Sequence, residues 1–308
     1  MTRCRARRAE KSSSGNCATP ICRRTREANR IHHRSRRSIV ELKGKHVDVA
    51  GTRTHYYDVG QGEPTILIHG GGPGASGLSN YRKNVEALAA RRRVIVFDLP
   101  GFGETEGKLK DGPIFEAMGD FTRAFMDAID VKKASFVGNS LGGATSLMVA
   151  LRAPERVNRL VLMGTGGSQA IFSPMPTEGL RRMAMFHAGE GPTLQKLKGV
   201  IDLLVFDQSS ITEELLAERL KAATRPDVID IFKRPPLDIW RENLAALKHR
   251  TLLIWGREDR VVPLDSSFIL LKTMPNAQLH VFPKCGHWAQ WEKADEFNAL
   301  VADFLDRP

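Results

Sequence analysis

The sequence Gly138-Asn139-Ser140-Leu141-Gly142 decides the fold. It matches the Gly-x-Ser-x-Gly pattern of a nucleophile elbow, a sharp turn between a strand and a helix. The apolar run Ala134–Val137 precedes it, and the helical pattern Leu141–Leu151 follows it. We expect a strained backbone at the serine, with glycines beside it because side chains would clash there. A nucleotide-binding turn is the alternative, but its Gly-x-Gly-x-x-Gly pattern is absent.

Outward from this turn, short apolar runs alternate with helical patterns. This alternation predicts an α/β fold whose mostly parallel sheet carries helices on both faces. The predicted strands are His46–Val49, Thr54–Val59 (a hairpin around Gly51), Thr65–His69, Arg93–Phe97, Ala134–Val137, Leu160–Met163, Thr251–Trp255 and Gln278–Phe282. Helices are predicted at Tyr81–Ala90, Phe115–Ile129, Leu141–Leu151, Ser266–Lys272 and Ala294–Asp306.

The alternation stops between residues 168 and 245. This segment contains helical patterns such as Leu194–Phe206 and Thr212–Ala223 but no convincing strand, and prolines punctuate both of its ends. We therefore expect a helical lid at 168–245, inserted after the sixth strand. The α/β core would comprise residues 39–167 and 246–308.

Residues 1–38 differ in composition from the rest of the chain. They contain twelve of the 46 Lys and Arg residues and only two acids, which leaves 34 basic and 33 acidic residues in the body. With few large apolar residues, the tail is predicted to be disordered. A transit peptide, nucleic-acid binding by the arginines, or a zinc site at Cys17, Cys22, His32 and His33 are weaker alternatives, and a functionless extension is preferred.

The composition of the 308-residue chain excludes several classes of protein. Apolar residues make up 42% and charged residues 26%, as in ordinary globular proteins. No apolar run approaches the about 18 residues that a membrane-spanning helix needs. The nearly neutral body gives no reason to expect nucleic acid or a membrane as its partner. Cys285 is the only cysteine of the body, which fits a reducing cytoplasm.

A serine nucleophile needs a base, and the base needs an orienting acid. Chains with this elbow carry the three groups in the order serine, acid, histidine. His287 follows the last predicted strand, whereas His280 lies inside that strand. Asp259 follows the strand Thr251–Trp255 and is the preferred acid. Its competitors are Glu258 and Asp265, and we expect Asp265 to cap the next helix.

An oxyanion hole requires two backbone N–H groups directed at one point. One is expected from Leu141, the residue after the nucleophile. The other is expected from the loop His69-Gly70-Gly71-Gly72-Pro73-Gly74-Ala75, which follows the strand Thr65–His69. Glycines in that loop would let the backbone approach a substrate closely. We expect no metal and no cofactor.

Together these motifs resemble the meta-cleavage product hydrolases of the α/β-hydrolase fold, from about residue 46 to 306. The specific segments are His69–Ala75, Gly138–Gly143, Trp255–Arg260 and Lys284–Glu292, with Pro174–Gly179 and Phe206–Leu216 in the insertion. The resemblance implies an eight-stranded sheet with a lid. It also implies a homo-oligomer, a small-molecule dienoate substrate and a role in the degradation of aromatic compounds. The basic tail has no counterpart in the family.

The resemblance further implies the substrate-binding residues. Arg219, in a lid helix, would hold the carboxylate and 2-oxo group of the substrate, for which a planar guanidinium is suited. Without the resemblance, Arg219 would be interpreted as part of a solvated helix face. Gly71 and Gly72 match the oxyanion loop of the family, which implies that Gly71 supplies the second N–H of the oxyanion hole. The other implied substrate-binding residues, besides Gly71 and Gly72, are Asn80, Asn139, Ser209 and Trp288.

The reaction implied is hydrolysis of a C–C bond in 2-hydroxy-6-oxohexa-2,4-dienoates that carry a substituent at C6. His287 would help to convert the dienol into its keto form. Ser140 would then attack the C6 carbonyl or activate water to do so, and the sequence does not choose between these routes. The products would be 2-hydroxypenta-2,4-dienoate and a carboxylic acid.

Other enzymes of the fold fit less well. An ester or lactone hydrolase would use the same triad but does not require Asn80, Arg219 and Trp288. Haloalkane dehalogenases and epoxide hydrolases have an aspartate in place of Ser140. Prolyl iminopeptidases would need acids in the lid for a free amine. A binding protein on this fold would have a broken triad, whereas all three residue types are present here.

Overall fold

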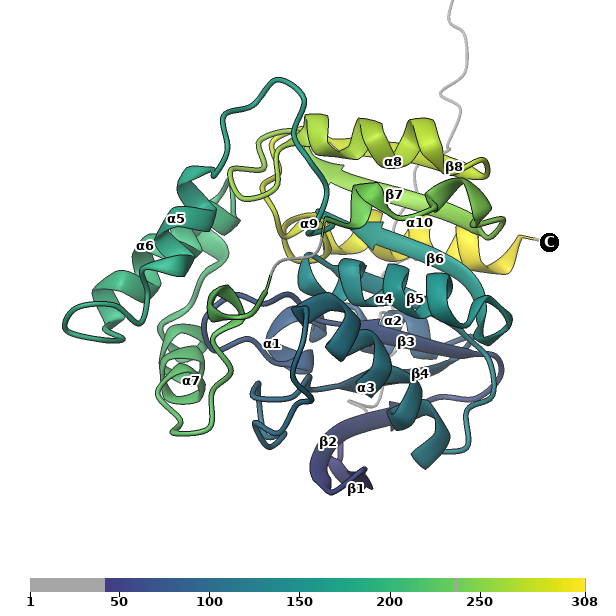
Figure 1. Ribbon diagram of the computed structural model, residues 1–308, viewed down its shortest axis with the longest axis horizontal. Helices are drawn as coiled ribbons and strands as arrows, with labels where there is room; N and C mark the ends of the chain where they lie inside the picture. The colour runs from purple at the N-terminus through teal and green to yellow at the C-terminus, as the bar shows by residue number, and fades with distance from the viewer. Residues whose placement is uncertain (1–41, 236–237, 308) are drawn as a thin grey trace, which may run out of the picture. The chain divides into compact units, whose positions relative to one another are not determined.

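The computed structural model describes residues 42–235 and 238–307 (Figure 1). Its centre is one eight-stranded sheet in the order β1-β2-β4-β3-β5-β6-β7-β8. Only the pairs β1·β2 and β2·β4 are antiparallel. The strands are β1 (Lys45–Val49), β2 (Thr52–Val59), β3 (Pro64–Ile68), β4 (Arg93–Phe97), β5 (Ala134–Asn139), β6 (Val157–Met163), β7 (Arg250–Gly256) and β8 (Ala277–Phe282). The predicted sheet and hairpin are confirmed. The predicted tail lies outside the described residues.

Two apolar layers cover the sheet because side chains alternate along each strand. In β3, Ile66 and Ile68 belong to one buried cluster, whereas Leu67 belongs to the other. The first layer contains α3 (Ile114–Ala128), α4 (Leu141–Arg152) and α8 (Ser267–Thr273). The second contains α1 (Gly77–Tyr81), α2 (Val85–Ala89), α9 (Ala289–Glu292) and α10 (Ala294–Asp306). The predicted helices on both faces are therefore confirmed.

One predicted helix is divided in two. The pattern Tyr81–Ala90 predicts a single helix, but α1 ends at Tyr81 and α2 begins after Asn84. The buried Asn84 amide instead donates to the carbonyl of Gln290 and to the side chain of Asn298. These tertiary hydrogen bonds fix the break between the helices.

Between β6 and β7 the described residues contain helices and no strand. The α-helices are α5 (Glu178–Ala184), α6 (Leu194–Leu204) and α7 (Glu213–Ala223), on the left of Figure 1. Each begins after a threonine whose hydroxyl accepts a first-turn N–H, namely Thr177, Thr193 and Thr212. The short 3-10 turn η2 (Gln208–Ser210) lies between α6 and α7, and the turns η3 (Ile231–Lys233), η4 (Ile239–Arg241) and η5 (Leu244–Ala246) follow α7.

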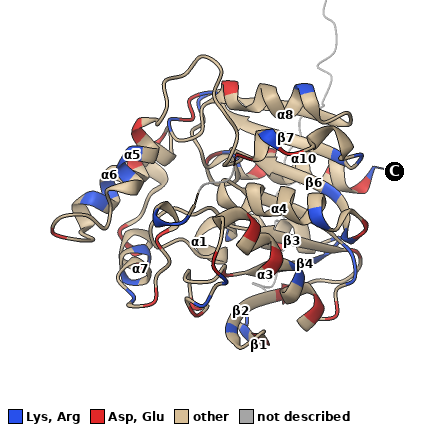
Figure 2. Ribbon diagram, viewed as in Figure 1, with Lys and Arg blue, Asp and Glu red and all other residues tan. Residues whose placement is uncertain are grey.

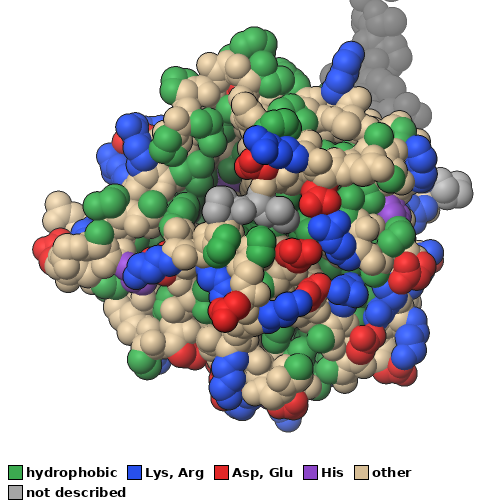
Figure 3. Space-filling model, in the orientation of Figure 1, with side chains coloured by type: hydrophobic (Ala, Val, Ile, Leu, Met, Phe, Trp, Pro, Cys, Tyr) green, Lys and Arg blue, Asp and Glu red, His purple; other side chains and the backbone are tan. Residues whose placement is uncertain are grey.

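The loop between β6 and α5 exposes apolar side chains, including Phe172, which is 81% exposed. The space-filling view shows hydrophobic side chains over this loop (Figure 3). Elsewhere, Lys and Arg alternate with Asp and Glu over the described surface (Figure 2). None of the described helices combines the length and hydropathy that a bilayer crossing needs.

The order of the strands determines where a site can form. β3 lies between β4 and β5, so successive connections leave in opposite directions from this point. Parallel strands place their carboxyl ends at one edge of the sheet, and ligands of open α/β sheets bind at such a switch point. The loops after β3, β5, β7 and β8 carry Gly71, Ser140, Asp259 and His287, respectively.

Candidate active site

Ser140 lies in the turn between β5 and α4 with φ 53° and ψ −111°. A positive φ is uncommon for a residue with a side chain and costs about 1–3 kcal/mol. The neighbouring glycines leave no room for a Cβ. A Cβ added to Gly142 would lie 2.0 Å from the carbonyl oxygen of Ile68. A Cβ added to Gly138 would lie 2.4 Å from the carbonyl oxygen of Gly142. The strained serine and the steric need for glycine are therefore confirmed.

His287 and Asp259 form a buried pair at the ends of β8 and β7. Nδ1 of His287 lies 2.6 Å from Oδ2 of Asp259. The other oxygen, Oδ1, accepts the N–H groups of Val261 and Val262 at 2.8 and 2.9 Å. An ionised carboxylate only accepts, so Nδ1 donates to it, and in a neutral imidazole Nε2 is then left with a free lone pair. This is the state that a general base requires.

Ser140 and His287 come from neighbouring loops, but no hydrogen bond joins their side chains in the described part of the chain. Such contacts are often long in unliganded enzymes and shorten when substrate binds. The backbone around Gly164 lies between the two loops, where a Cβ would be 2.7 Å from the His287 ring. The roles of Ser140 as nucleophile, His287 as base and Asp259 as orienting acid stay predictions.

The competing acids are occupied elsewhere. Glu258 accepts the Cys285 N–H at 3.0 Å and forms an ion pair with Arg257. Asp265 accepts the N–H groups of Ile171, Phe172 and Ser173, so the expectation that it caps a helix is wrong. Burial raises the pKa of Asp265, but these donors lower it more, to about 2.

The candidate oxyanion groups are adjacent. A Cβ added to Gly71 would lie 3.1 Å from the Leu141 side chain, so the two backbones approach closely. Neither of their N–H groups donates to another group in the described residues. The side chain of His69, the first residue of this loop, fixes the loop by two hydrogen bonds. Its Nδ1 donates to the Gly70 carbonyl at 2.8 Å, and its Nε2 accepts the Leu99 N–H at 3.0 Å. Burial lowers the pKa of His69, in keeping with a neutral ring.

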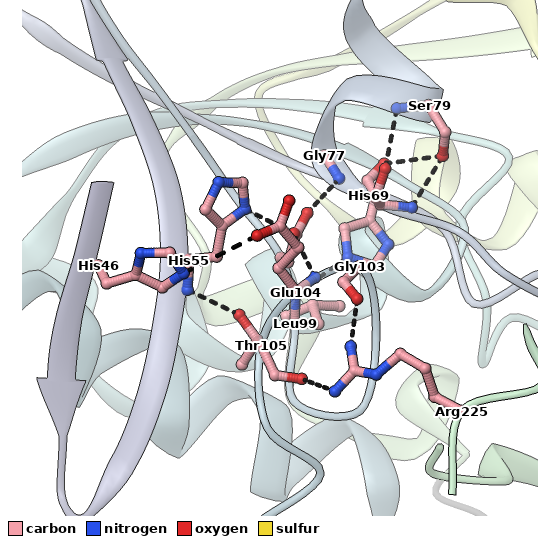
Figure 4. Close-up of polar contacts among 12 residues, drawn as sticks. His46, His55, His69, Gly77, Ser79, Leu99, Gly103, Glu104, Thr105 and Arg225 are labelled. Carbon is pink, nitrogen blue, oxygen red and sulfur yellow. Dashed lines mark hydrogen bonds and ion pairs between the residues drawn. The ribbon is translucent and has the colours of Figure 1, made fainter. Parts of the chain in front are cut away.

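Beside this loop lies a second buried polar cluster, which the sequence analysis did not find (Figure 4). Asp98 accepts hydrogen bonds from His55 at 2.8 Å, from the Gly77 N–H at 2.7 Å and from the Glu104 N–H at 2.9 Å. Arg225, just after α7, donates to the carbonyls of Gly103 and Thr105. The cluster thus ties β2, α1 and the loop after β4 to the insertion.

Arg219 of α7 is fully buried and points to the oxyanion loop. Its Nε and Nη2 donate to the Pro73 carbonyl at 3.1 and 2.8 Å. Its guanidinium carbon lies 5.0 Å from the centre of the Trp288 ring. No acidic side chain of the described residues forms an ion pair with it. Burial lowers the pKa of Arg219 to about 9. The solvated helix face, expected from spacing alone, is wrong for this residue.

Gly72, Asn80 and Asn139 lie close to the oxyanion loop, Arg219 and the backbone of His287. A Cβ at Gly72 would be 3.2 Å from Nη2 of Arg219. Asn80 donates to the Asn139 side chain at 3.1 Å, and Asn139 in turn donates to the His287 carbonyl at 3.3 Å. Buried amides therefore extend from α1 to the backbone of the candidate base.

Ser209 is not brought to this cluster. It is exposed in η2, and its N–H donates to the Asp207 side chain at 2.9 Å. Its neighbour Ser210 accepts the indole N–H of Trp291 at 3.1 Å instead. The substrate-binding role of Ser209 stays a prediction without a contact to support it.

A small cavity opens next to the oxyanion loop, between the core and the insertion. The described residues that line it are mainly apolar and include no Lys or Arg. The residues are Gly71, Pro73, Gly74, Gly101, Phe102, Met183, His187, Ala222, Val228, Ile229, Asp230, Ile231 and Phe232. Within the described chain, no cluster of three or more His, Cys, Asp or Glu residues is arranged to hold a metal ion.

Comparison with known proteins places this arrangement among similar chains. The family profile of the α/β-hydrolase fold matches residues 64–294. A 2-hydroxy-6-oxo-6-phenylhexa-2,4-dienoate hydrolase of Burkholderia cepacia is 46% identical over 262 residues, which cover 82% of this chain and 91% of the relative. A 2-hydroxy-6-oxononadienedioate/2-hydroxy-6-oxononatrienedioate hydrolase of Escherichia coli is 41% identical over 266 residues, covering 83% and 92%.

A solved structure agrees with these relatives. The meta-cleavage product hydrolase of Pseudomonas fluorescens, a serine-to-alanine mutant with bound acetates, superimposes with a TM-score of 0.76 at 38% identity. The match covers 85% of this chain and 97% of that protein. Both the sequence and the fold are therefore similar over nearly the whole of the described chain.

Proposed function

The chain belongs to the α/β-hydrolase family and, within it, to the meta-cleavage product hydrolases, and we propose that it hydrolyses 2-hydroxy-6-oxohexa-2,4-dienoates carrying a substituent at C6. Such compounds are the ring-opened products formed in the degradation of aromatic compounds. The enzyme is a serine-dependent hydrolase of a C–C bond.

In the proposed mechanism, His287 first moves a proton that converts the dienol into its keto form. The C5–C6 bond then breaks with the addition of one water molecule. The C6 carbonyl becomes the carboxylic acid, and the other fragment leaves as 2-hydroxypenta-2,4-dienoate. Asp259 keeps Nδ1 of His287 protonated, so that Nε2 accepts the proton from Ser140 or from water.

The developing charge on the C6 oxygen would be stabilised by two backbone donors. The N–H groups of Gly71 and Leu141 are adjacent and make no other hydrogen bond in the described residues. Ser140 attacks C6 directly, or it activates water to form a gem-diol. Trapping an acyl-enzyme by rapid quench distinguishes the first route from the second.

The observation that carries this proposal is the environment of Arg219. A buried cation without an anionic partner is costly, and a bound anion would offset that cost. The guanidinium lies against the oxyanion loop and the Trp288 ring, next to the catalytic loop. A dienoate supplies a carboxylate and a 2-oxo group that this guanidinium could bind. A neutral ester has no such group.

We further propose that the substituent at C6 is neutral and apolar. Support comes from the lining of the cavity at Gly71, which is mainly apolar, includes Phe102, Met183 and Ile231, and contains no Lys or Arg. A carboxylate-bearing chain at C6 would meet only His187 as a possible cationic partner among the lining side chains, and Asp230 would repel it. An apolar group would gain from burial.

Spectrophotometric turnover of three substrates tests the function. These are the 6-phenyl dienoate, a dienoate with a carboxylate chain at C6, and a p-nitrophenyl ester. We expect the highest kcat/KM for the 6-phenyl compound and the formation of 2-hydroxypenta-2,4-dienoate with benzoate. Preference for the dicarboxylate would overturn the C6 proposal alone. Efficient turnover of the ester only would overturn the C–C hydrolase proposal.

The organisation of the chain is proposed on the same basis. Residues 39–167 and 246–308 form the core, and residues 168–245 form a helical lid that shapes the substrate site. Residues 1–38 are proposed to be dispensable. The family relationship supports a homo-oligomer, and the burial of Cys285 as a free thiol supports a reducing, cytoplasmic environment.

A further inference from the structure

Glu292, the last residue of α9, binds main-chain N–H groups from two separate segments. Its Oε1 accepts from Phe206 and Asp207 at 2.8 and 2.9 Å. Its Oε2 accepts from Gly286 at 2.7 Å. Phe206 and Asp207 follow α6 of the insertion, whereas Gly286 directly precedes His287. One carboxylate therefore joins the insertion to the backbone of the candidate base.

The two segments also touch through their main chains. The Trp288 N–H donates to the Leu204 carbonyl at 3.2 Å. A Cβ added to Gly286 would lie 2.8 Å from that same oxygen, so the close approach requires glycine. The segment that ends α6 is thus packed directly against the residues on both sides of His287, and Glu292 binds both partners of this contact.

Hydrogen bonds, and no ion pair within the described residues, hold the Glu292 carboxylate. Burial raises the pKa of Glu292, although its three N–H donors and the charge of Lys293 lower it. An ionised carboxylate accepts on both oxygens, whereas an amide has one oxygen and one NH₂ group. In Glu292→Gln the NH₂ group would face an N–H donor, so the variant would lose its link either to the insertion or to Gly286.

We propose that Glu292 is a positioning residue for His287, on the basis of the function proposed above. By fixing the Gly286 N–H, it sets the path of the main chain into His287 and keeps Nε2 directed at Ser140. By binding Phe206 and Asp207 with its other oxygen, it ties that path to the insertion. Movement of a catalytic group by about 1 Å costs up to about 100-fold in rate.

Asp265→Asn is the matched control for Glu292→Gln. Asp265 also accepts three N–H groups of the insertion, from Ile171, Phe172 and Ser173, but contacts no residue next to His287. For both variants, kcat and KM are measured on the 6-phenyl dienoate and on a p-nitrophenyl ester, together with Tm. We expect Glu292→Gln to lower kcat on both substrates by about 10- to 100-fold with KM within about threefold. Asp265→Asn should leave kcat within about threefold.

A second readout needs no substrate. The Nδ1 proton of His287, in its 2.6 Å hydrogen bond to Asp259, is expected to give a far-downfield proton NMR signal. This signal should shift or broaden in Glu292→Gln and stay in place in Asp265→Asn. This signal tests the positioning role of Glu292 even if the wild-type enzyme does not cleave dienoates. Such a failure would overturn only the proposed function.

Equal losses of kcat in the two variants, or an unchanged His287 signal in Glu292→Gln, would overturn the positioning role and leave Glu292 as a structural link. If Glu292→Gln does not fold, Glu292→Asp takes its place in both measurements. It keeps the charge but is one methylene shorter, and it should show the same kcat-specific loss and a moved His287 signal. Wild-type values for both would overturn the proposal.

Discussion

The guanidinium of Arg219 lies over the indole ring of Trp288, 5.0 Å from its centre. Arg219 belongs to the insertion, and Trp288 follows His287 directly in the chain. A buried cation–π contact of this kind contributes about 2 kcal/mol. It places the proposed anion-binding group next to the loop of the proposed base, so that one substrate could engage both.

Replacement of Ser140 or His287 by alanine should abolish most turnover while substrate still binds. We expect kcat on the dienoate to fall by at least about 1,000-fold in each variant, because each removes a group that acts on the reacting atoms. Stopped-flow absorbance measures both binding and turnover. Substantial residual turnover in Ser140→Ala would mean that the serine only positions the substrate.

Asp259→Asn should be nearly as severe. The amide replaces the oxygen that accepts the Nδ1 proton of His287 at 2.6 Å, so the ring loses its orientation and its tautomer. A loss of about 10,000-fold in kcat is expected at neutral pH. Near-normal rates would assign the acid role to Glu258 or Asp265, against the hydrogen bonds that hold those two residues elsewhere.

The buried pair of His55 and Asp98 should make stability depend on pH. Burial lowers the pKa of His55, but the hydrogen bond and the charge of Asp98 raise it by more. The folded-state pKa therefore exceeds the ordinary value. The resulting stabilisation is present below the unfolded-state pKa of about 6.5 and is lost as pH rises through the folded-state pKa. His55→Gln should therefore reduce the free energy of unfolding more at pH 6 than at pH 9.

Urea unfolding of wild type and His55→Gln at both pH values measures this difference. The contribution of Asp98 to stability changes with pH in the opposite direction. Burial raises the pKa of Asp98, but His55 and two N–H donors lower it more, so its contribution is present above the unfolded-state pKa and lost as pH falls. A penalty for His55→Gln that is the same at pH 6 and pH 9 would show that the pair does not carry a charge.

Much of the fold follows from local pattern. β4 occupies the predicted residues Arg93–Phe97, and α4 extends the predicted Leu141–Leu151 by one residue. Apolar β-branched runs and helical spacing suffice for such elements because their burial is set by their own periodicity. The split between α1 and α2 was missed because it depends on Asn84 contacting residues more than 200 positions away.

The site divides in the same way. The elbow at Ser140 was predictable because the Gly-x-Ser-x-Gly pattern is contained in five consecutive residues, although the backbone that leaves no room at Gly142 is that of the distant Ile68. Asp265 and Glu292, which bind the insertion, carry no local signal, because each accepts main-chain N–H groups of a distant segment and any segment offers such groups. The burial of Arg219 also depends on how α7 packs, so its place came from family resemblance and not from helical spacing.

Deletion of residues 1–38 should leave the enzyme intact. The excess positive charge of the chain is confined to this tail, and its composition does not support a core. Turnover and Tm of the truncated chain should match those of the full chain. A fall in kcat/KM of more than about tenfold, which corresponds to about 1.4 kcal/mol, would contradict the proposal that the tail is dispensable.

The most direct test of the central claim is the change in kcat/KM that Arg219→Gln causes on a dienoate and on a neutral p-nitrophenyl ester. Hydrogen bonds to charged groups contribute about 1.5–3 kcal/mol, so the dienoate should lose about 10- to 200-fold and the ester little. Arg219→Lys should restore only part of the loss, because an ammonium lacks the planar fork. Equal loss on both substrates, or no loss on the dienoate, would contradict the account.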